Sequence, residues 1–231
     1  MVTHMQIAFE IAARPFNFPY DGRLDPAQAA LLVIDLQVDF LASDGYFARK
    51  GYDPAPLRAI LPTVNALIAT ARQAGLLIVH TRQGYRADMA DMTEYERWRR
   101  RRSGLDGTAV MLRGSPGYEV VPEIPVATWD VVVDKTANGA FTHTDLEHVL
   151  RARDITHLLF SGCTTDVCVH STLREAVDRN FQCLLIEDAC ASADRYAHEA
   201  AIHMVTVEDG VFGTVARSAD VLGALRGVAA Q

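Results

Sequence analysis

The chain has 231 residues, 49% of them hydrophobic, and a formal net charge of −7 at pH 7. This length suits one domain with a sizeable core, and the acidic total excludes a general binder of nucleic acid or anionic membranes, which needs a basic face. The four cysteines lack the dense spacing of a disulfide framework, and we find no signal peptide or membrane-length apolar run, so a cytoplasmic location is expected.

The N-terminal part of the chain carries little pattern before its first strand. We expect a flexible arm over residues 1–15 and a single domain over residues 16–231. The segment from Phe16 to Tyr20 is aromatic and broken by proline, which favours packing on a surface or a neighbouring subunit. The apolar run from Ala30 to Ile34 then indicates a buried strand that ends on the carboxylate of Asp35.

A helix and a second strand follow. Apolar residues between Ile60 and Ala71 recur at helical spacing, and Gly75 stands where a C-cap belongs. The run from Leu76 to His80 indicates the next buried strand, and a strand, a helix and a strand in this order predict a right-handed parallel crossover. The connection from Thr81 to Pro125 is long and weakly periodic, as lids and interface loops are. Its basic run, Arg99 to Arg102, favours an interface or pairing with the protein's own carboxylates over a nucleic-acid patch.

In the second half of the chain, predicted strands again alternate with predicted helices. This alternation predicts an α/β protein with a doubly wound, mainly parallel sheet and helices on both faces. The expected elements are a strand at 131–133 ending on Asp134-Lys135, a helix over 146–155 behind a cap at 143–145, strands at 155–160 and 183–186, a helix over 193–204, a short strand at 205–207 and a closing helix over 219–225.

The segment SGCTTDVCVHSTLREA, residues 161–176, follows one of these strands and opens a helix. Cys168 stands in the first turn of that helix, where free N–H groups and the dipole favour a thiolate. It is either a nucleophile or a buried structural thiol. Asp35 and Lys135 end two other strands, and parallel strands bring their carboxyl ends to one crevice. The Asp35 carboxylate can accept the proton of the thiol, and the Lys135 ammonium can stabilise the carboxylate and the thiolate. These complementary roles favour a catalytic triad over a structural ion pair.

These three elements in this order resemble the isochorismatase-like cysteine hydrolases, and the resemblance extends from about Phe16 to Leu225. Segments such as FPYDGRL, HTRQGYRADMAD, RWRRRRSG, TTDVCVHSTLREA and DGVFG are similar to the biuret hydrolase branch, which includes triuret hydrolase. The resemblance implies a six-stranded sheet of order 3-2-1-4-5-6, a homotetramer, and a non-proline cis peptide between Cys163 and Thr164.

The chemistry predicted from these residues is that of a cysteine-dependent amidohydrolase. Cys168 attacks a carbonyl, Asp35 moves the thiol proton to the leaving nitrogen, and Lys135 supports the charges. The backbone N–H groups of Thr164 and Cys168 are expected to bind the oxyanion. No cofactor is expected, and a metal site has little support because the eight histidines show neither H-x-H nor H-E-x-x-H spacing. A non-catalytic small-molecule-binding module is the alternative class.

The substrate is expected to be a small urea-type molecule. By the resemblance to biuret hydrolases, the position of Glu208 corresponds to a glutamine in those enzymes, whereas this chain has a glutamate. A carboxylate only accepts hydrogen bonds, which favours a ligand with many N–H groups on that side, so triuret is expected first and biuret second. N-carbamoylsarcosine and ureidoacrylate are the alternative substrates, and a solvent-facing Glu208 is the alternative for that residue. The side chains expected to contact the substrate are those of Gln37, Phe40, Asn138, Phe141, Thr165 and Glu208.

Overall fold

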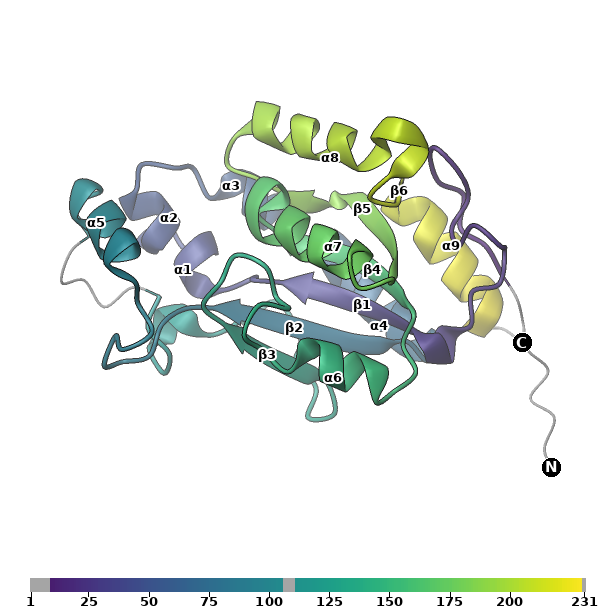
Figure 1. Cartoon of the computed structure of the whole chain (residues 1–231), viewed down its shortest axis with the longest axis horizontal. Coiled ribbons are helices and arrows are strands. Elements are labelled where there is room, and N and C mark those ends of the chain that lie inside the picture. The colour runs from purple at the N-terminus through teal and green to yellow at the C-terminus, as the bar shows by residue number, and fades with distance from the viewer. Residues whose placement is uncertain (1–8, 106–110, 230–231) are drawn as a thin grey trace.

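The computed structural model describes residues 9–105 and 111–229, and these form a six-stranded parallel sheet with helices on both faces (Figure 1). The strand order is β3-β2-β1-β4-β5-β6, and every neighbouring pair is parallel. Both the doubly wound fold class and the strand order are therefore confirmed. The strands are β1 (Ala29–Ile34), β2 (Leu77–Gln83), β3 (Val131–Lys135), β4 (His157–Cys163), β5 (Gln182–Ala191) and β6 (Thr214–Ala216).

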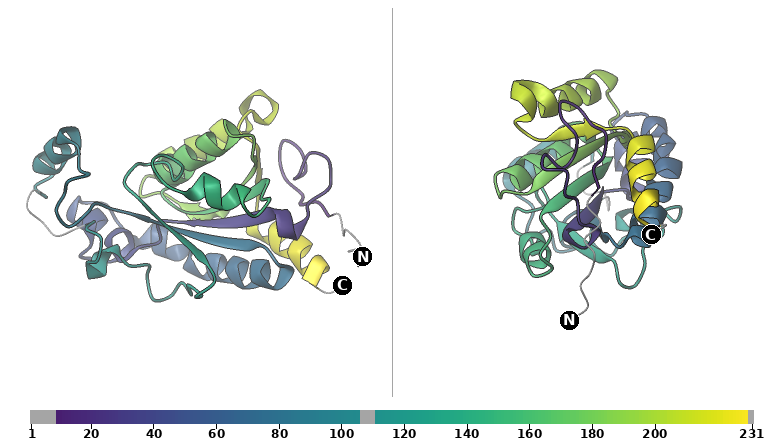
Figure 2. Two further views of the ribbon diagram at one scale, coloured as in Figure 1. Left: turned by 60° about the horizontal axis from the view of Figure 1, so that its bottom comes forward. Right: turned by 90° about the vertical axis from the view of Figure 1, so that its right-hand side faces the viewer.

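Two layers of helices enclose the sheet, as the end-on view in Figure 2 shows. Within the described residues the helices are α1 (Val38–Leu41), α2 (Tyr46–Arg49), α3 (Ala55–Ala59), α4 (Leu61–Ala74), α5 (Glu94–Arg102), α6 (Leu146–Arg151), α7 (His170–Val177), α8 (Arg195–Gly210) and α9 (Ser218–Ala229). Short turns of 3-10 helix are η1 (Pro26–Gln28) and η2 (Pro116–Tyr118), and η3 (Thr165–Val169) is a π-helical turn directly before α7.

The hydrophobic core is split by the sheet into two halves. Successive side chains of a strand point to opposite faces, so Leu31 and Val33 of β1 join the apolar residues of α4 and α9, whereas Leu32 and Ile34 join those of α6 and α7. All six residues of β1 are buried. Burial on both faces explains why the central strands are continuous apolar runs rather than alternating ones.

The last part of the chain differs from the sequence prediction. Residues 205–207, expected as a strand, belong to α8, and the last strand is β6. Ala201 and Val205 are buried one helical turn apart, so packing of this face overrides the β-branched composition. The helix is then interrupted at Val207–Asp209, where Glu208 and Asp209 have positive φ values of 50° and 58°.

Part of the expected N-terminal arm is packed against the domain. Ile11 is fully buried and exchanges backbone hydrogen bonds with Phe18, and Arg14 exchanges them with Val215 of β6. Residues 9–15 are therefore held by the fold rather than extending from it, because Ile11 adds an apolar side chain to the core. Residues 1–8 of the expected arm lie outside the described residues.

The long connection after β2 contains α5, which lies beyond the carboxyl ends of the strands near α1 and α2 (Figure 1). Thr93 caps this helix by accepting a hydrogen bond from the N–H of Glu96. Arg99 and Arg100 pair with Glu96, and Arg101 pairs with Glu94. The prediction that the basic run pairs with the protein's own carboxylates is confirmed. In the part of the chain described, no helix combines the length and apolar character needed to cross a membrane.

Candidate active site

A cavity of about 350 Å³ opens at the carboxyl ends of the strands. We call inner wall the residues at the strand ends, namely Gln83 at the end of β2, Asn138 after β3, and Thr164 and Cys168 after β4. The term includes the buried pair Asp35 and Lys135, because Lys135 hydrogen-bonds to Gln83 and Asn138. Its outer wall consists of side chains of α1, α2, α5 and the neighbouring loops, namely Phe40, Tyr46, Phe47, Lys50, Tyr52, Tyr85, Glu96, Arg99, Arg100 and Met111. The rest of the lining comes from η3 and from the segment that starts α8.

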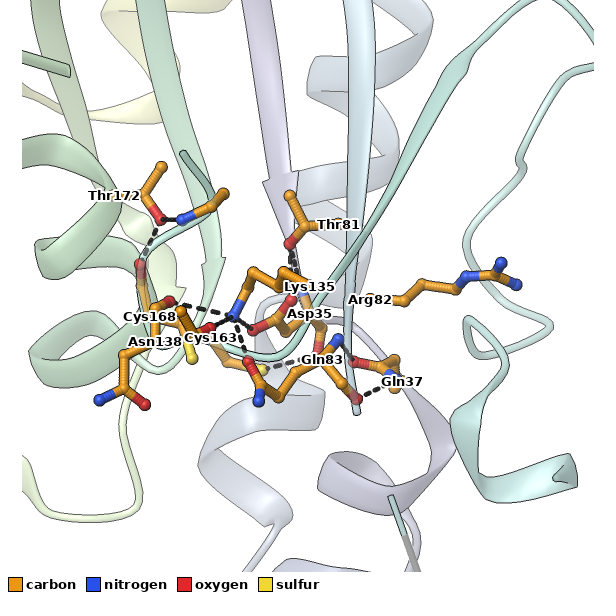
Figure 3. A network of polar contacts seen from close by, with 12 residues as sticks. Asp35, Gln37, Thr81, Arg82, Gln83, Lys135, Asn138, Cys163, Cys168 and Thr172 are labelled. Atoms are coloured by element: carbon orange, nitrogen blue, oxygen red, sulfur yellow. Dashed lines mark hydrogen bonds and ion pairs between the residues drawn. The ribbon is translucent and has the colours of Figure 1, made fainter. Parts of the chain in front are cut away.

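The centre of the inner wall is a buried ion pair between Lys135 and Asp35 (Figure 3). Lys135 Nζ lies 2.8 Å from Asp35 Oδ2, and both side chains are fully buried. The ammonium also donates to Gln83 Oε1 at 2.6 Å and to two backbone carbonyls, those of Ala137 and Asn138, at 3.1 and 3.0 Å. Such saturation of an ammonium offsets the large cost of burying its charge.

Asp35 is fixed in one orientation by its own neighbours. Thr81 Oγ1 donates to Asp35 Oδ1 at 2.6 Å and also accepts from the Asp35 N–H at 3.2 Å. The Asp35 backbone has a φ of 51°, a left-handed conformation that Asp tolerates better than most residues. This bend turns the carboxylate away from the line of β1 and toward Lys135.

Cys168 completes a contiguous set with these two residues. Its thiol lies near enough to Asp35 and Lys135 for both charges to act on its pKa. Burial raises the pKa of the Cys168 thiol to about 12, with Lys135 opposing the rise and Asp35 adding to it. The start of a helix was expected to favour a thiolate, but burial has the larger effect and favours the protonated thiol.

The ammonium of Lys135 stays charged in this setting. Burial acts to lower the pKa of Lys135, but Asp35 and Cys168 outweigh it and raise the pKa above its ordinary value. An ammonium that stays charged beside Asp35 stabilises any negative charge that develops on the sulfur. The arrangement thus suits proton transfer from sulfur to carboxylate at the moment of attack.

The two central strands approach closely below these side chains. Gly162 of β4 has a φ of 113°, and a Cβ atom built there would lie 2.1 Å from the carbonyl oxygen of Ile34. The next residue, Cys163, directs its Sγ to the carbonyl of Asp35 at 3.1 Å. The peptide bond between Cys163 and Thr164 is cis, as the family resemblance implied. Burial and the nearby Asp35 raise the pKa of Cys163 well above its ordinary value.

A hydroxyl links the turn that carries Cys168 to the loop after β3 (Figure 3). Thr172 Oγ1 donates to the carbonyl of Cys168 at 2.6 Å and accepts from the N–H of Ala140 at 3.1 Å. Thr172 is fully buried. Because the loop after β3 also supplies the carbonyls that hold Lys135, Thr172 ties the thiol and the ammonium to one another.

The side chains expected to contact substrate divide into two groups. Phe40 and Asn138 line the cavity, whereas Gln37, Phe141 and Thr165 are not among its lining residues. The Gln37 amide donates to the carbonyls of Gln83 and Tyr118 and accepts from the Gln83 N–H, so it braces the inner wall from behind. Phe141 packs on Phe181 and on the guanidinium of Arg179, and Thr165 Oγ1 hydrogen-bonds with His198 Nδ1.

Glu208 lies at the wrong end of α8 for substrate contact. The cavity is lined by Asp194 and Ala197 at the start of this helix. Glu208 is exposed and does not line the cavity, and a helix that rises 1.5 Å per residue places it about 20 Å further along the axis. The preference for triuret, which depended on this residue, loses its basis because Glu208 lies outside the cavity.

The outer wall was not foreseen from the sequence as a part of the site. Of its residues only Phe40 was predicted to contact the substrate, whereas Arg99 to Arg102 were expected at an interface or paired with the protein's own carboxylates. The signal that pointed to it was the unusual length of the connection that contains α5. No group of three or more His, Cys, Asp or Glu side chains among residues 9–105 and 111–229 is arranged to hold a metal ion.

The sequence is similar to known amidohydrolases. Residues 29–220 match the family model described as the isochorismatase domain. A ureidoacrylate amidohydrolase from Cronobacter turicensis is 31% identical over 93% of this chain and 95% of its own length. A similar enzyme from Klebsiella pneumoniae, also named ureidoacrylate amidohydrolase, is 32% identical over 83% of this chain and 84% of its own.

Solved structures share the fold. A cysteine hydrolase from Pseudomonas syringae pv. phaseolicola superimposes with a TM-score of 0.78 over 89% of this chain and 95% of its own, at 24% identity. An N-carbamoylsarcosine amidase from Thermoplasma acidophilum has a TM-score of 0.64 and 26% identity over 83% of this chain and 96% of its own. The overlap therefore includes the sheet and most of the helices around it.

Proposed function

The chain belongs to the isochorismatase domain family, and from that premise we propose that it is an amidohydrolase that uses Cys168 to cleave a C–N bond of a small ureido compound. The observation that carries the proposal is the grouping of the Asp35–Lys135 ion pair and the Cys168 thiol in one buried cluster at a cavity. Perturbed ionisable groups at a cavity are typical of reaction centres. The similarity to ureidoacrylate amidohydrolases and to an N-carbamoylsarcosine amidase supports amide chemistry.

The first half of the reaction forms a covalent intermediate. Asp35 accepts the thiol proton as Cys168 Sγ bonds to the substrate carbonyl, and the oxyanion binds the N–H groups of Thr164 and Cys168. Protonated Asp35 then donates to the leaving nitrogen as the C–N bond breaks. The products of this half are an amine and an acyl or carbamoyl thioester on Cys168.

The second half returns the enzyme to its resting state. Asp35, again a carboxylate, takes a proton from water as the hydroxyl bonds to the thioester carbonyl. The C–S bond then breaks, and the proton on Asp35 returns to the sulfur. Lys135 remains charged throughout and stabilises the carboxylate and thiolate states in turn.

The substrate order differs from the one predicted from Glu208. With that residue outside the cavity, the similarity to ureidoacrylate amidohydrolases favours ureidoacrylate and related N-carbamoyl compounds as the first candidates. Triuret and biuret stay as the second candidates, because the flanking segments resemble their hydrolases. A cavity of about 350 Å³ suits molecules of this size.

The test combines a substrate panel with trapping of the intermediate. Purified protein is incubated with ureidoacrylate, N-carbamoylsarcosine, biuret and triuret, and ammonia and amine products are measured. Acid-quenched wild type should carry a covalent adduct by intact mass spectrometry, whereas Cys168→Ala should carry none and lose more than about a thousandfold in kcat. Near-normal turnover by Cys168→Ala, or no turnover of any amide together with measurable binding, would reject the proposal in favour of another nucleophile or a binding module.

A further inference from the structure

The turn that carries Cys168 is bonded to a histidine of a different helix. Thr165, the first residue of η3, is only 1% exposed and does not line the cavity. Its Oγ1 lies 2.8 Å from Nδ1 of His198, which stands near the start of α8. Since α8 also packs on η3, this hydrogen bond ties the start of the turn to the helix layer above it.

The geometry of η3 explains why such a bond matters. The turn is π-helical, a rare form that is often found at functional sites. The carbonyl of Thr164 accepts from the N–H groups of both Val167 and Val169 at 3.1 Å. At the other end of the turn, Thr172 holds the carbonyl of Cys168. Side chains therefore fix both ends of the turn, one from α7 and one from α8.

His198 stands between this turn and a second cavity. That cavity, of about 440 Å³, is lined by residues of the N-terminal arm, β5 and α8, including His198 and His203. His198 is half-buried, and burial lowers its pKa, while Glu187, Glu199 and Asp166 act in the opposite direction. A ring that is neutral near pH 7 has one donor and one acceptor nitrogen. Because a threonine hydroxyl both donates and accepts, either tautomer keeps the bond.

Building on the function proposed above, we infer that His198 is a positioning residue for the oxyanion site. Through Thr165 it holds the N–H groups of Thr164 and Cys168 in the arrangement that binds the oxyanion. Donors fixed before the reaction stabilise a developing charge better than donors that must first reorient. His198 does not line the cavity that holds Cys168, so it acts on the rate of the chemical step and not on the binding of the substrate.

The first test removes the ring nitrogens. His198→Leu should lower kcat about 20-fold for the best substrate of the panel and leave KM within about a factor of two, because the loss concerns the transition state. His198→Asn places a polar atom near the position of Nδ1 and should retain most of the activity. His203→Leu alters an exposed residue of the same helix and the same cavity, and it should leave kcat unchanged.

Alkylation of Cys168 separates oxyanion binding from a general disturbance of the turn. When iodoacetamide reacts, the sulfur bonds to the CH₂ carbon, iodide leaves and the thiol proton is released, so no oxyanion forms. The rate then depends on the thiolate fraction and on access to the sulfur. His198→Leu should therefore be alkylated at a rate within about twofold of wild type, although its amide turnover falls.

A double-mutant cycle tests whether the two side chains act as one unit. Thr165→Val has nearly the same shape but lacks the hydroxyl, and it should lower kcat about as much as His198→Leu. The double variant should be no slower than either single variant, because each one already breaks the same bond. If His198→Leu does not fold, Thr165→Val with the alkylation assay supplies the same comparison.

The outcomes distinguish this inference from the proposed function. Unchanged kcat in His198→Leu, losses that multiply in the double variant, or alkylation that accelerates as turnover falls would overturn the inference and leave the hydrolase proposal intact. If wild type turns over no amide, the proposed function fails, and the inference fails with it. A loss of kcat in His198→Leu and Thr165→Val, with recovery in His198→Asn and unchanged alkylation, would support both.

Discussion

The two walls of the cavity are built in different ways. The inner wall is made of strand ends and the turns directly after them, and its polar atoms are fixed by several short contacts each, as for Lys135 and Asp35. The outer wall is made of three short helices, α1, α2 and α5, and of loops, and its side chains meet through ring contacts and shared charges. The first arrangement holds reacting groups in place, and the second presents a surface to a ligand.

This contrast indicates that the two walls serve different purposes, the inner wall for the reaction and the outer wall for the choice of substrate. Sheet ends are rigid because each strand is bonded to its neighbours, so they suit chemistry that fails when groups move. Helices in a long connection tolerate substitution better, so they suit the choice of substrate. Changes on the inner wall should therefore reduce kcat for every substrate, whereas changes on the outer wall should act on KM for some substrates and not for others.

The largest effect is expected from breaking the ion pair of the inner wall. Lys135→Met leaves the carboxylate of Asp35 buried without its cation, which should destabilise the fold by about 3–5 kcal/mol. It should also lower kcat more than about a thousandfold for all substrates, because the sulfur loses its cationic neighbour. Denaturant unfolding and steady-state kinetics measure the two effects. A variant that loses activity toward one substrate alone would contradict the contrast between the walls.

A second prediction uses the pH dependence of the thiol in the substrate-free enzyme. Because the pKa of Cys168 is raised to about 12, the group is protonated below that value and its thiolate fraction grows as pH rises. Alkylation of Cys168 by iodoacetamide should therefore accelerate about tenfold per pH unit between about pH 7 and pH 10. Peptide mass spectrometry follows the reaction, with Cys168→Ser reporting the background. A rate that levels off near neutral pH would indicate a thiolate already formed at rest.

The smallest of the three effects concerns the hydroxyl that joins the two loops of the inner wall. Thr172→Val has nearly the same shape but loses both hydrogen bonds, and we expect kcat to fall about tenfold with KM within about a factor of two. Thr172→Ser keeps the hydroxyl and should retain most of the activity. If the serine and valine variants behave alike, the methyl group rather than the hydroxyl matters, and Thr172 does not align the thiol with the ammonium.

The inner wall was predictable from the sequence because it follows from chain geometry. Asp35, Lys135 and Cys168 each follow an apolar run, and parallel strands bring such positions to one edge. The pattern did not report which neighbouring polar groups face inward. Gln37 stands two residues after Asp35, yet its amide is consumed by the backbone of Gln83 and Tyr118, a set of contacts that depends on three separate segments.

Neither the outer wall nor the end of α8 could be predicted from the sequence, and the physical reasons differ between them. Arg100 lies in a connection of weak periodicity, so its distance from Cys168 in space has no simple relation to the sequence. At the end of α8, the β-branched residues of 205–207 favoured a strand, while burial of Ala201 and Val205 on one face decided for helix. As a result, Glu208 lies near the end of α8, away from the cavity that the start of this helix lines.

The close packing of Gly162 against the backbone of Ile34 limits which residues can replace this glycine. A methyl group there would meet the carbonyl oxygen of Ile34 and force β1 and β4 apart. The proposed proton acceptor, Asp35, follows β1, and the proposed nucleophile, Cys168, follows β4. The proposed chemistry therefore requires glycine at a position that does not itself line the cavity. An inactive relative would be recognisable by a side chain at this one position, even with its reactive residues intact.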